Sequence, residues 1–420
     1  MSSYIIKGGH PLYGEVTVSG SKNAALGIIA ASMVLDGPCV IDNVPHIMDV
    51  GVLLDICRVL GATVDEIDEH TIRIDPTTVV SKEATTEKTR HIRASYYLLG
   101  ALLARFNEVK LNMPGGCNFG TRPIDLHLKG FHSMGASHEL VDGVIHLKAD
   151  KLTGGHLYMN QASVGATINV MIAATKANGS TVIENAAREP HIVDVANFLN
   201  IMGANIKGAG TDTIRITGVP KLPGYKTYSI IPDQIEAGTF MVAAAAARGD
   251  VVVRNLIPKH MEPLTQKMRE MGVTMEEGGD WIRVLAKPEK ELNPTTFKTR
   301  PYPGFPTDLQ PQVTILLCTA TGNSQMHENV WENRFQYIDE LKRMNVDISI
   351  AGSVALVMGP QQMTSARVKA LDLRAGAAMV IAATIVDGVS EIYDVHMIER
   401  GYENIVEKLR GIGVDITTKD

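Results

Sequence analysis

The chain has 420 residues, more than one compact domain usually holds, so two domains are expected. Hydrophobic residues make up 45% of the sequence and charged residues 20%, which is the balance of an ordinary soluble globular protein. The net charge of -6 argues against a general binder of nucleic-acid phosphates, and the aromatic content of 5% argues against base-stacking platforms.

The four cysteines are scattered and form no CxxC pair, so a zinc site is not expected. Three of them, Cys39, Cys57 and Cys318, lie in apolar runs and are predicted to be core residues of a protein from a reducing compartment. The first residues include no apolar stretch of signal-peptide length, and the run from Ala24 to Leu35 is too short to span a bilayer. We therefore expect a cytoplasmic protein that does not insert into membranes.

In chain order, the predicted elements repeat six times. Each repeat has a helix of small residues, a strand, a second helix and a further strand. The second helix of every repeat is followed by a residue suited to a left-handed C-cap, glycine five times and asparagine once. These positions are Gly61, Gly135, Gly203, Gly272, Asn345 and Gly413.

The first helix of each repeat is apolar nearly all round after one polar residue. Residues 241–247, with the sequence MVAAAAA, are the extreme case. A helix that is apolar on all sides is buried, so the sheets are expected to surround these helices. This reverses the usual α/β layering, in which helices cover a sheet. The polar first residues are Lys22, Arg93, Ser163, Glu236, Asp308 and Arg374.

Six repeats divide into two sets of three, which predicts two domains. The first would span 22–231 and carry the loop around Cys117; the second would comprise 1–21 and 232–420. The first strand, predicted from Ile5 to Gly20, would complete the second domain, and Pro220–Gly224 reads as a linker. The active site is expected in the cleft between the domains.

The stretch Gly115-Gly116-Cys117-Asn118 places a thiol among small residues. Arg122 lies five residues on, and a nearby cation favours the reactive thiolate. Pro123 marks the first turn of a helix, whose positive end also favours anions. The alternative is that Cys117 is a small hydrophobic residue at a loop tip. If the loop is a lid, its glycines supply the hinge.

Cations at the starts of the buried helices point to an anionic ligand. Capping explains Ser163, Asp308 and Glu236, but a cation such as Lys22, Arg93 or Arg374 opposes the helix dipole. Arginines also stand at the starts of four second helices, where the alternative for each is a solvated surface residue. They are Arg122, Arg188, Arg334 and Arg400. Among these cations Asp308 would be a base and Cys117 an acid.

Several common motifs are missing from the sequence. No Walker A motif or spaced GxGxxG follows a strand, and no HExxH motif is present. Four histidines near the second helices could touch a ligand, although a satisfied surface histidine is the expectation for each. They are His127, His191, His260 and His396.

The chain resembles the UDP-N-acetylglucosamine 1-carboxyvinyltransferases, a family of enolpyruvyl transferases, from Gly14 to Asp415. The segments that carry the resemblance are 14–25 (GEVTVSGSKNAA), 114–127 (PGGCNFGTRPIDLH), 163–167 (SVGAT), 184–190 (ENAAREP), 305–308 (FPTD), 332–335 (ENRF) and 399–403 (ERGYE). The resemblance implies a two-domain inside-out α/β barrel of six repeated units, in agreement with the repeats. The cysteine loop separates this family from the shikimate-pathway enolpyruvyl transferases.

The resemblance implies transfer of the enolpyruvyl group of phosphoenolpyruvate to the 3-hydroxyl of UDP-N-acetylglucosamine, with release of phosphate, at the start of peptidoglycan synthesis. In this reaction Cys117 would protonate the methylene group and Asp308 would take the proton of the sugar hydroxyl. Phosphoenolpyruvate would be held by Lys22, Asn23, Arg122, Arg334, Arg374 and Arg400. No metal and no cofactor are implied, because these side chains supply the positive charge.

The resemblance also implies a sugar-nucleotide site. Its residues would be Asn23, Arg93, Arg122, Pro123, Ile124, Asp125, Leu126, Ser163, Val164, Asp308 and Val330. Some family members have a lysine at the position of Gln161, so a cationic diphosphate contact there is not expected. Cys117 would be alkylated by the epoxide fosfomycin.

Two alternative functions would use the same fold. One is an enolpyruvyl transferase for 3-phosphoshikimate, against which the Cys117 loop argues. The other is a non-catalytic ligand-binding relative, against which the joint presence of Lys22, Asp308, Arg400 and Cys117 argues. In every case the expected partners are small molecules and not nucleic acid. The sequence does not indicate which oligomeric state the protein has.

Overall fold

The computed structural model describes residues 2–113 and 124–419. These residues form two compact units. The first unit comprises residues 20–113 and 124–231, and the second comprises 2–19 and 232–419. Cys117, Arg122 and Pro123 lie outside the described residues.

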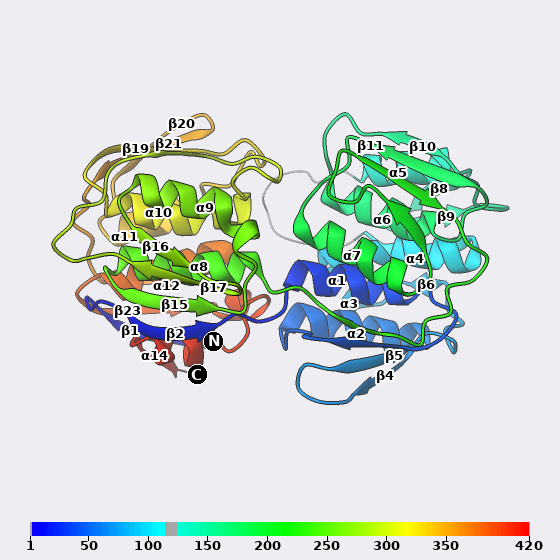
Figure 1. Ribbon diagram of the computed structural model, residues 1–420, viewed down its shortest axis with the longest axis horizontal. Coiled ribbons are helices and arrows are strands. Elements are labelled where there is room, and N and C mark those ends of the chain that lie inside the picture. Colours follow the sequence, from blue (N-terminus) through cyan, green and yellow to red (C-terminus); the bar gives the residue numbers. More distant parts are fainter. Residues whose placement is uncertain (1, 114–123, 420) are drawn as a thin grey trace. The chain divides into compact units, whose positions relative to one another are not determined.

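The first unit contains three helix-and-sheet repeats (Figure 1). Its elements in chain order are α1 (Lys22–Ser32), β3 (Cys39–Asp42), α2 (Met48–Leu60), β4 (Thr63–Glu66), β5 (Ile72–Asp75), β6 (Glu83–Ala84), α3 (Glu87–His91), η1 (Arg93–Tyr96), α4 (Tyr97–Phe106), β7 (Glu108–Asn112), α5 (Asp125–Ser133), β8 (Ser137–Val141), β9 (Val144–Lys148), β10 (His156–Tyr158), α6 (Val164–Ala174), β11 (Ser180–Glu184), α7 (Pro190–Ile201), β12 (Asn205–Lys207), β13 (Thr213–Thr217) and β14 (Thr227–Ser229).

The second unit repeats the same plan. Its elements are β1 (Ser3–Gly8), β2 (Tyr13–Thr17), α8 (Gln234–Ala246), β15 (Asp250–Arg254), α9 (Pro258–Glu270), β16 (Thr274–Glu277), β17 (Trp281–Leu285), β18 (Thr296–Lys298), η2 (Thr307–Leu309), α10 (Gln310–Cys318), β19 (Gly322–His327), α11 (Ile338–Arg343), β20 (Ile348–Ala351), β21 (Val354–Gly359), β22 (Arg367–Lys369), α12 (Leu373–Ile385), β23 (Gly388–Tyr393), α13 (His396–Glu399), α14 (Ile405–Gly411) and β24 (Asp415–Lys419).

The described residues form six four-stranded sheets, three of which include a strand from outside their own repeat, namely β1, β2 and β14. Five of the six sheets combine a central strand, an antiparallel hairpin and one parallel edge strand, as in the order β18-β19-β21-β20. The sixth has the order β22-β23-β1-β24, so β1 from the start of the chain lies between two strands from its end. There Ile6 is opposite both Ser390 and Ile416.

The prediction of a single first strand from Ile5 to Gly20 is wrong. The segment forms two strands that belong to two sheets, because β1 pairs with β23 and β24 whereas β2 runs parallel to β15. The chain turns between them at Gly9, whose φ of 90° lies in the region that favours glycine. Alternation of apolar residues alone does not reveal such a turn.

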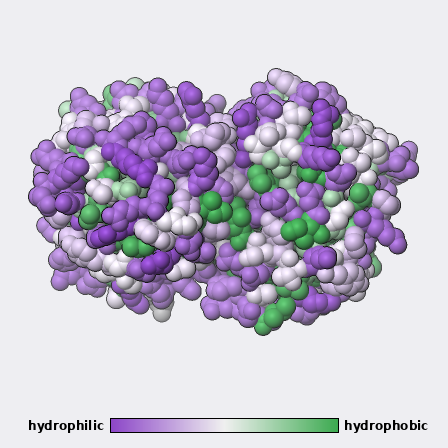
Figure 2. Space-filling view, in the orientation of Figure 1, coloured by the Kyte–Doolittle hydropathy of each residue, from purple (hydrophilic) through white to green (hydrophobic). Residues whose placement is uncertain are grey.

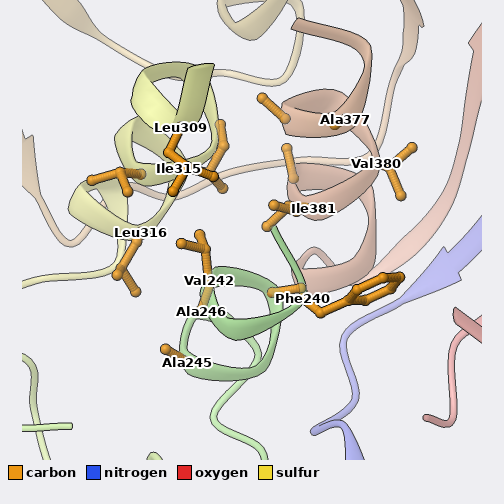
Figure 3. Packing of buried hydrophobic residues seen from close by; sticks show 14 of the residues in the cluster. Phe240, Val242, Ala245, Ala246, Leu309, Ile315, Leu316, Ala377, Val380 and Ile381 are labelled. Carbon is orange, nitrogen blue, oxygen red and sulfur yellow. The ribbon is translucent and has the colours of Figure 1, made fainter. Parts of the chain in front are cut away.

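The first helices of the repeats are buried, as predicted. In α8 every residue from Ile235 to Ala246 is buried, and in α12 so is every residue from Leu373 to Thr384. Figure 3 shows the packing of α8 and α12 with the α10 region, where Val242, Ile315 and Ile381 meet. The sheets lie around these helices within each unit (Figure 1). This is the inside-out α/β arrangement that the repeats predicted.

Small residues allow these helices to pack closely. A Cβ atom on Gly238 of α8 would lie 2.5 Å from Cδ1 of Leu309, which is closer than real Cβ contacts come. An alanine here would force the Leu309 side chain to shift, so the glycine allows the close approach of η2 to α8. Alanine-rich, all-apolar sequences in these helices thus reflect both burial and short interhelical distances.

The predicted C-cap residues all have positive φ angles, so these predictions are confirmed. The angles run from 60° at Asn345 to 109° at Gly203. This conformation costs little for glycine and is tolerated by asparagine. Here the local sequence is sufficient to place the end of each second helix.

The prediction that Pro220–Gly224 is a linker is wrong. Leu222 is fully buried in the core of the first unit. Its N–H donates to a carboxylate oxygen of Asp36 at 2.7 Å, and its carbonyl accepts from the Asp36 N–H. The prolines and glycine made the segment resemble a linker, but one apolar side chain anchors it.

On the face shown in Figure 2, hydrophobic residues form small separate patches among hydrophilic ones. Within residues 2–113 and 124–419, no helix has the length and apolar character needed to cross a membrane.

Candidate functional site

Lys22 stands in the first turn of α1 but does not cap it. Ser21 is the N-cap, and its hydroxyl accepts from the Ala24 N–H at 3.4 Å. The side chain of Lys22 is instead directed to α2, where its ammonium nitrogen lies 2.7 Å from Oδ2 of Asp49. Both side chains are nearly buried, with exposed fractions of 10% and 6%. The ion pair therefore places a cation beside a helix N-terminus, where an anion would be stabilised.

Sequence reasoning missed Asp49. The residue lies in the first turn of α2, where an acidic side chain is explained by the helix dipole alone. A signal was available, because a cation predicted at a buried helix N-terminus requires a counter-charge nearby. The sequence does not say which of the acidic residues provides it.

The predicted nucleotide residues of the first unit lie at the starts of its elements. Arg93 begins η1, and its guanidinium lies 5.8 Å from the ring centroid of Tyr96. Ile124 is the N-cap of α5, and Asp125 and Leu126 begin that helix. Ser163, Val164 and Asn23 stand in the same kind of position on α6 and α1.

Ser163 caps α6, as the capping alternative predicted, because its hydroxyl accepts from the Ala166 N–H at 3.3 Å. The cap uses one lone pair of the hydroxyl and leaves it able to donate.

His127 is buried, so the expectation of a surface histidine is wrong. It is 4% exposed, and Nδ2 of Asn169 lies 2.9 Å from its Nδ1. The Asn169 amide also donates to the Tyr96 carbonyl and accepts from the Gly100 N–H. Burial, reinforced by Arg93, lowers the pKa of His127 to about 3, so the ring is neutral at physiological pH.

Asp308 is the centre of the candidate site in the second unit. It lies in η2, whose N-cap is Pro306, and no side chain caps this turn. The capping alternative for Asp308 is therefore wrong. Its Oδ1 lies 3.2 Å from Nη2 of Arg334, and its Oδ2 lies 3.1 Å from Nη2 and 3.3 Å from Nε of Arg374.

The two arginines are buried but their carboxylate partner is not. The side chains of Arg334 and Arg374 are 3% and 5% exposed, whereas 31% of the Asp308 side chain is exposed. Burial alone would lower the pKa of Arg374, but Asp308, Tyr402 and Asp233 together outweigh it, so the pKa is raised. The cluster thus presents one accessible carboxylate backed by two permanent cations.

Arg374 also does not cap its helix. Asp372 is the N-cap of α12 and accepts from the N–H groups of Arg374 and Ala375. Arg374 is thereby free to direct its guanidinium to Asp308. Arg400 is the C-cap of the short helix α13, and Val330 donates its N–H to Oε1 of Glu328 at 2.8 Å.

The capping alternative for Glu236 is also wrong. Asp233 caps α8, and the buried Glu236 accepts from Nζ of Lys408 at 2.5 Å. Burial raises the pKa of Glu236 to about 7, against the opposing effect of Lys408. Arg188 lies 3.7 Å from Asp212 and both are exposed, which fits the alternative of a solvated surface arginine.

The other three cysteines are core residues, as predicted. Burial raises the pKa of Cys39, of Cys57 and of Cys318 to about 12, so their thiols stay protonated. Among the described residues no group of three or more histidine, cysteine or acidic side chains could hold a metal ion.

Each unit thus carries its own cluster. The first unit presents Lys22 with Asp49 at the start of α1, and the second presents Asp308 of η2 with Arg374 at the start of α12 and with Arg334, which lies in the turn before α11. Fixed cations of this kind bind phosphate or carboxylate groups, and an accessible carboxylate can take a proton. That a cleft between the domains holds the active site stays a prediction.

Comparison with known families identifies one that matches nearly the whole chain. The model of the EPSP synthase (3-phosphoshikimate 1-carboxyvinyltransferase) family matches residues 6–409. Among curated relatives, the UDP-N-acetylglucosamine 1-carboxyvinyltransferase 3 of Caldanaerobacter subterraneus is 52% identical over 416 residues, 99% of each chain. The UDP-N-acetylglucosamine 1-carboxyvinyltransferase of Halothermothrix orenii is also 52% identical over 416 residues, again 99% of each.

Solved structures agree in fold. The enolpyruvyl transferase NikO from Streptomyces tendae superposes with a TM-score of 0.91 at 27% identity, covering 100% of this chain and 99% of that one. EPSP synthase from Acinetobacter baumannii gives a TM-score of 0.76 at 19% identity, with 100% of both chains covered, and this likeness concerns the fold alone.

Proposed function

The chain belongs to the EPSP synthase family of carboxyvinyltransferases, and we propose that it transfers the enolpyruvyl group of phosphoenolpyruvate to the 3-hydroxyl of UDP-N-acetylglucosamine. The observation that carries this proposal is the 52% identity, over 99% of the chain, with relatives named for that reaction. The products are the 3-O-enolpyruvyl ether and inorganic phosphate.

The reaction proceeds by addition and then elimination. In the addition, the sugar 3-oxygen forms a bond to C2 of phosphoenolpyruvate, its proton passes to a base, and an acid delivers a proton to C3. The product is a tetrahedral intermediate with a methyl group. In the elimination, C3 loses a proton, the C2–C3 double bond forms again and the C2–O bond to phosphate breaks. Protons and electrons balance without an oxidant or a metal.

Asp308 serves as the base for the sugar hydroxyl. Its partial exposure leaves room for a substrate, and its bonds to Arg334 and Arg374 orient the carboxylate. A base backed by cations is a weak one, but it need only accept a proton while the oxygen forms its bond to C2. The sugar hydroxyl becomes more acidic as that bond forms, so the proton transfer does not require a strong base.

The cations hold the charged reactant. Lys22, Arg122 and Arg400 bind the phosphate of phosphoenolpyruvate, and Arg334 and Arg374 bind its carboxylate and developing charge. Asn23 assists at the same place. The burial of Lys22, Arg334 and Arg374 supports this assignment, because preorganised charges in a water-poor site stabilise a transition state more strongly than solvated ones.

Cys117 serves as the acid that protonates C3, and it forms a covalent adduct with phosphoenolpyruvate. Sequence alone supports this role, since Cys117 lies outside the described residues. The sugar nucleotide is bound by the residues around Arg93, by 122–126 and by Ser163 with Val164, and its sugar by Asn23, Asp308 and Val330. The enzyme acts in the cytoplasm at the start of peptidoglycan synthesis and so serves cell-wall growth, cell shape and division.

The test is release of inorganic phosphate from phosphoenolpyruvate by the purified chain. We expect release only when UDP-N-acetylglucosamine is present, with transfer of the enolpyruvyl group to the sugar nucleotide seen by mass spectrometry. Release that depends on 3-phosphoshikimate instead would overturn the acceptor. Absence of release with either acceptor would support a non-catalytic relative.

A further inference from the structure

One side chain contacts all three buried helices of the second unit. Tyr402 follows Arg400 by two residues, lies between α13 and α14, and is only 3% exposed. Its hydroxyl oxygen is 2.8 Å from Oγ1 of Thr239 on α8 and 3.2 Å from Nε2 of Gln312 on α10. Its ring lies beneath Arg374 of α12, with the guanidinium carbon 5.4 Å from the ring centroid.

The directions of the two hydroxyl hydrogens in this network can be assigned. Thr239 donates its hydroxyl hydrogen to the Ile235 carbonyl at 2.8 Å, so it must accept from the Tyr402 hydroxyl. Nε2 of Gln312 shares its two hydrogens among three acceptors, the Asp308 carbonyl at 3.0 Å and the Tyr402 and Thr239 hydroxyl oxygens at 3.2 Å each. The phenol therefore both donates and accepts, and its position is held from two helices. Burial raises the pKa of Tyr402, so the phenol stays neutral.

The Tyr402 ring restricts the position of the Arg374 guanidinium. The guanidinium carbon lies over the ring within cation–π distance and the Tyr402 hydroxyl is also a hydrogen-bond partner of Arg374, while Nε and Nη2 of Arg374 meet Oδ2 of Asp308 at 3.3 and 3.1 Å. Arg374 thus lies between an aromatic ring held by two helices and the carboxylate. Because Asp308 has its other oxygen bound to Arg334, a shift of Arg374 would rotate or displace the carboxylate.

We propose that Tyr402 is a positioning residue for the reaction, whose ring fixes the guanidinium of Arg374 and, through it, the carboxylate of Asp308. The inference rests on the proposed function, in which Asp308 takes the proton of the sugar hydroxyl. Tyr402 touches no reacting atom in this account. The ring is the main contact that positions Arg374, and the hydroxyl holds the ring and adds a hydrogen bond to Arg374.

Two substitutions separate the ring from the hydroxyl. Tyr402→Phe removes the hydrogen bonds of the hydroxyl, including that to Arg374, but keeps the ring and the cation–π contact, so we expect kcat to stay within about threefold of wild type. Tyr402→Leu removes the ring, and we expect kcat to fall by roughly 100-fold, because misplacement of a catalytic group by about 1 Å costs about that much. KM for UDP-N-acetylglucosamine should change far less than kcat.

Phe240→Leu is the matched control. Phe240 is on the same helix as Thr239 and is 1% exposed, and Figure 3 shows its side chain directed away from Leu309, the neighbour of Asp308. This substitution removes an aromatic ring of similar size from the same core, so it should lower the melting temperature about as much as Tyr402→Leu. Its kcat should stay near that of wild type.

Crystal structures of Tyr402→Leu and Phe240→Leu give a readout that does not depend on turnover. We expect the Arg374 guanidinium to be displaced from Asp308 in the first and unmoved in the second. An unmoved guanidinium in Tyr402→Leu, or equal losses of kcat in the two leucine variants, would overturn the inference. If wild-type protein releases no phosphate, the proposed function fails, while the crystal structures still decide whether Tyr402 positions Arg374.

Discussion

The ammonium group of Lys22 lies 2.7 Å from Oδ2 of Asp49, and both side chains are almost inaccessible to solvent. The pair joins the first turn of the buried helix α1 to the first turn of α2. A buried charge is costly unless it is paired, so Asp49 allows Lys22 to remain a cation before any substrate phosphate arrives.

Lys22→Gln should raise KM for phosphoenolpyruvate about 10- to 100-fold, because a hydrogen bond from a charged donor contributes about 1.5–3 kcal/mol. Asp49→Asn should raise it less and lower the melting temperature. The double variant should resemble Lys22→Gln alone, since the two residues act through one interaction. Steady-state kinetics with phosphoenolpyruvate varied and UDP-N-acetylglucosamine saturating measures these effects.

Lys176→Gln is the control for Lys22→Gln. Lys176 also pairs with an aspartate of the first unit, at 2.7 Å from Oδ1 of Asp36. Its loss should leave KM unchanged. An unaltered KM in Lys22→Gln as well would contradict a role of Lys22 in binding the phosphate.

Asp308→Asn should reduce turnover by about 10²–10⁴-fold, the usual contribution of a general base, because an amide cannot take the hydroxyl proton. The melting temperature should also fall, since two buried arginines lose their carboxylate. Asp250→Asn is the control, as Asp250 binds Arg283 through both oxygens at 2.7 Å on a partly exposed sheet surface. Turnover close to wild type in a folded Asp308→Asn protein would leave Asp308 only its structural role.

Fosfomycin should alkylate Cys117 and no other cysteine. The thiols of Cys39, Cys57 and Cys318 are buried, and burial raises the pKa of each to about 12, so they offer almost no thiolate. Mass spectrometry of a digest after treatment, with and without UDP-N-acetylglucosamine, locates the label, and labelling should be faster with the nucleotide. Cys117→Asp should keep activity and resist the epoxide. A label on any of the buried cysteines would show that the reactive thiol is assigned wrongly.

Asp194 should make the stability of the first unit fall as the pH rises through about 6. Its carboxylate accepts from the Tyr228 hydroxyl at 2.5 Å and from the Ile231 N–H at 3.2 Å, and burial raises its pKa from 3.8 to about 6. The folded state therefore favours the protonated form. The stabilisation is complete below the unfolded pKa of 3.8 and is lost as the pH rises through 6.

Asp194→Asn carries no charge at any pH, so relative to wild type it should gain about 1 kcal/mol in unfolding free energy between pH 5 and 8. Urea unfolding at both pH values measures this. Asp36→Asn is the control. Burial acts to raise the pKa of Asp36, but Lys176 and the Leu222 N–H together lower it by more, so the pKa is lowered overall. Asp36 therefore does not titrate between pH 5 and 8. A pH-independent difference for Asp194→Asn would contradict the assignment.

Local features of this protein could be predicted from the sequence because they depend on neighbouring residues. The all-round apolar pattern of residues 241–247 was enough to predict a buried helix, since such a helix has no face for water. The residue after each second helix was recognisable because only glycine and asparagine readily adopt its positive φ. The six repeats then led to helices surrounded by sheets.

Features that depend on distant segments were decided by the tertiary structure. Asp308 reads as a helix cap within its own segment, but Arg374, 66 positions away, and Arg334 hold it instead. Asp49 and Leu222 carried no distinctive local pattern, yet one neutralises Lys22 and the other anchors the segment that resembled a linker. Periodicity and capping rules describe a segment and its solvent, whereas an ion pair requires two side chains to meet after the repeats have packed. The sequence therefore determined the repeating architecture and the residue types of the site, and folding decided which charge each of them meets.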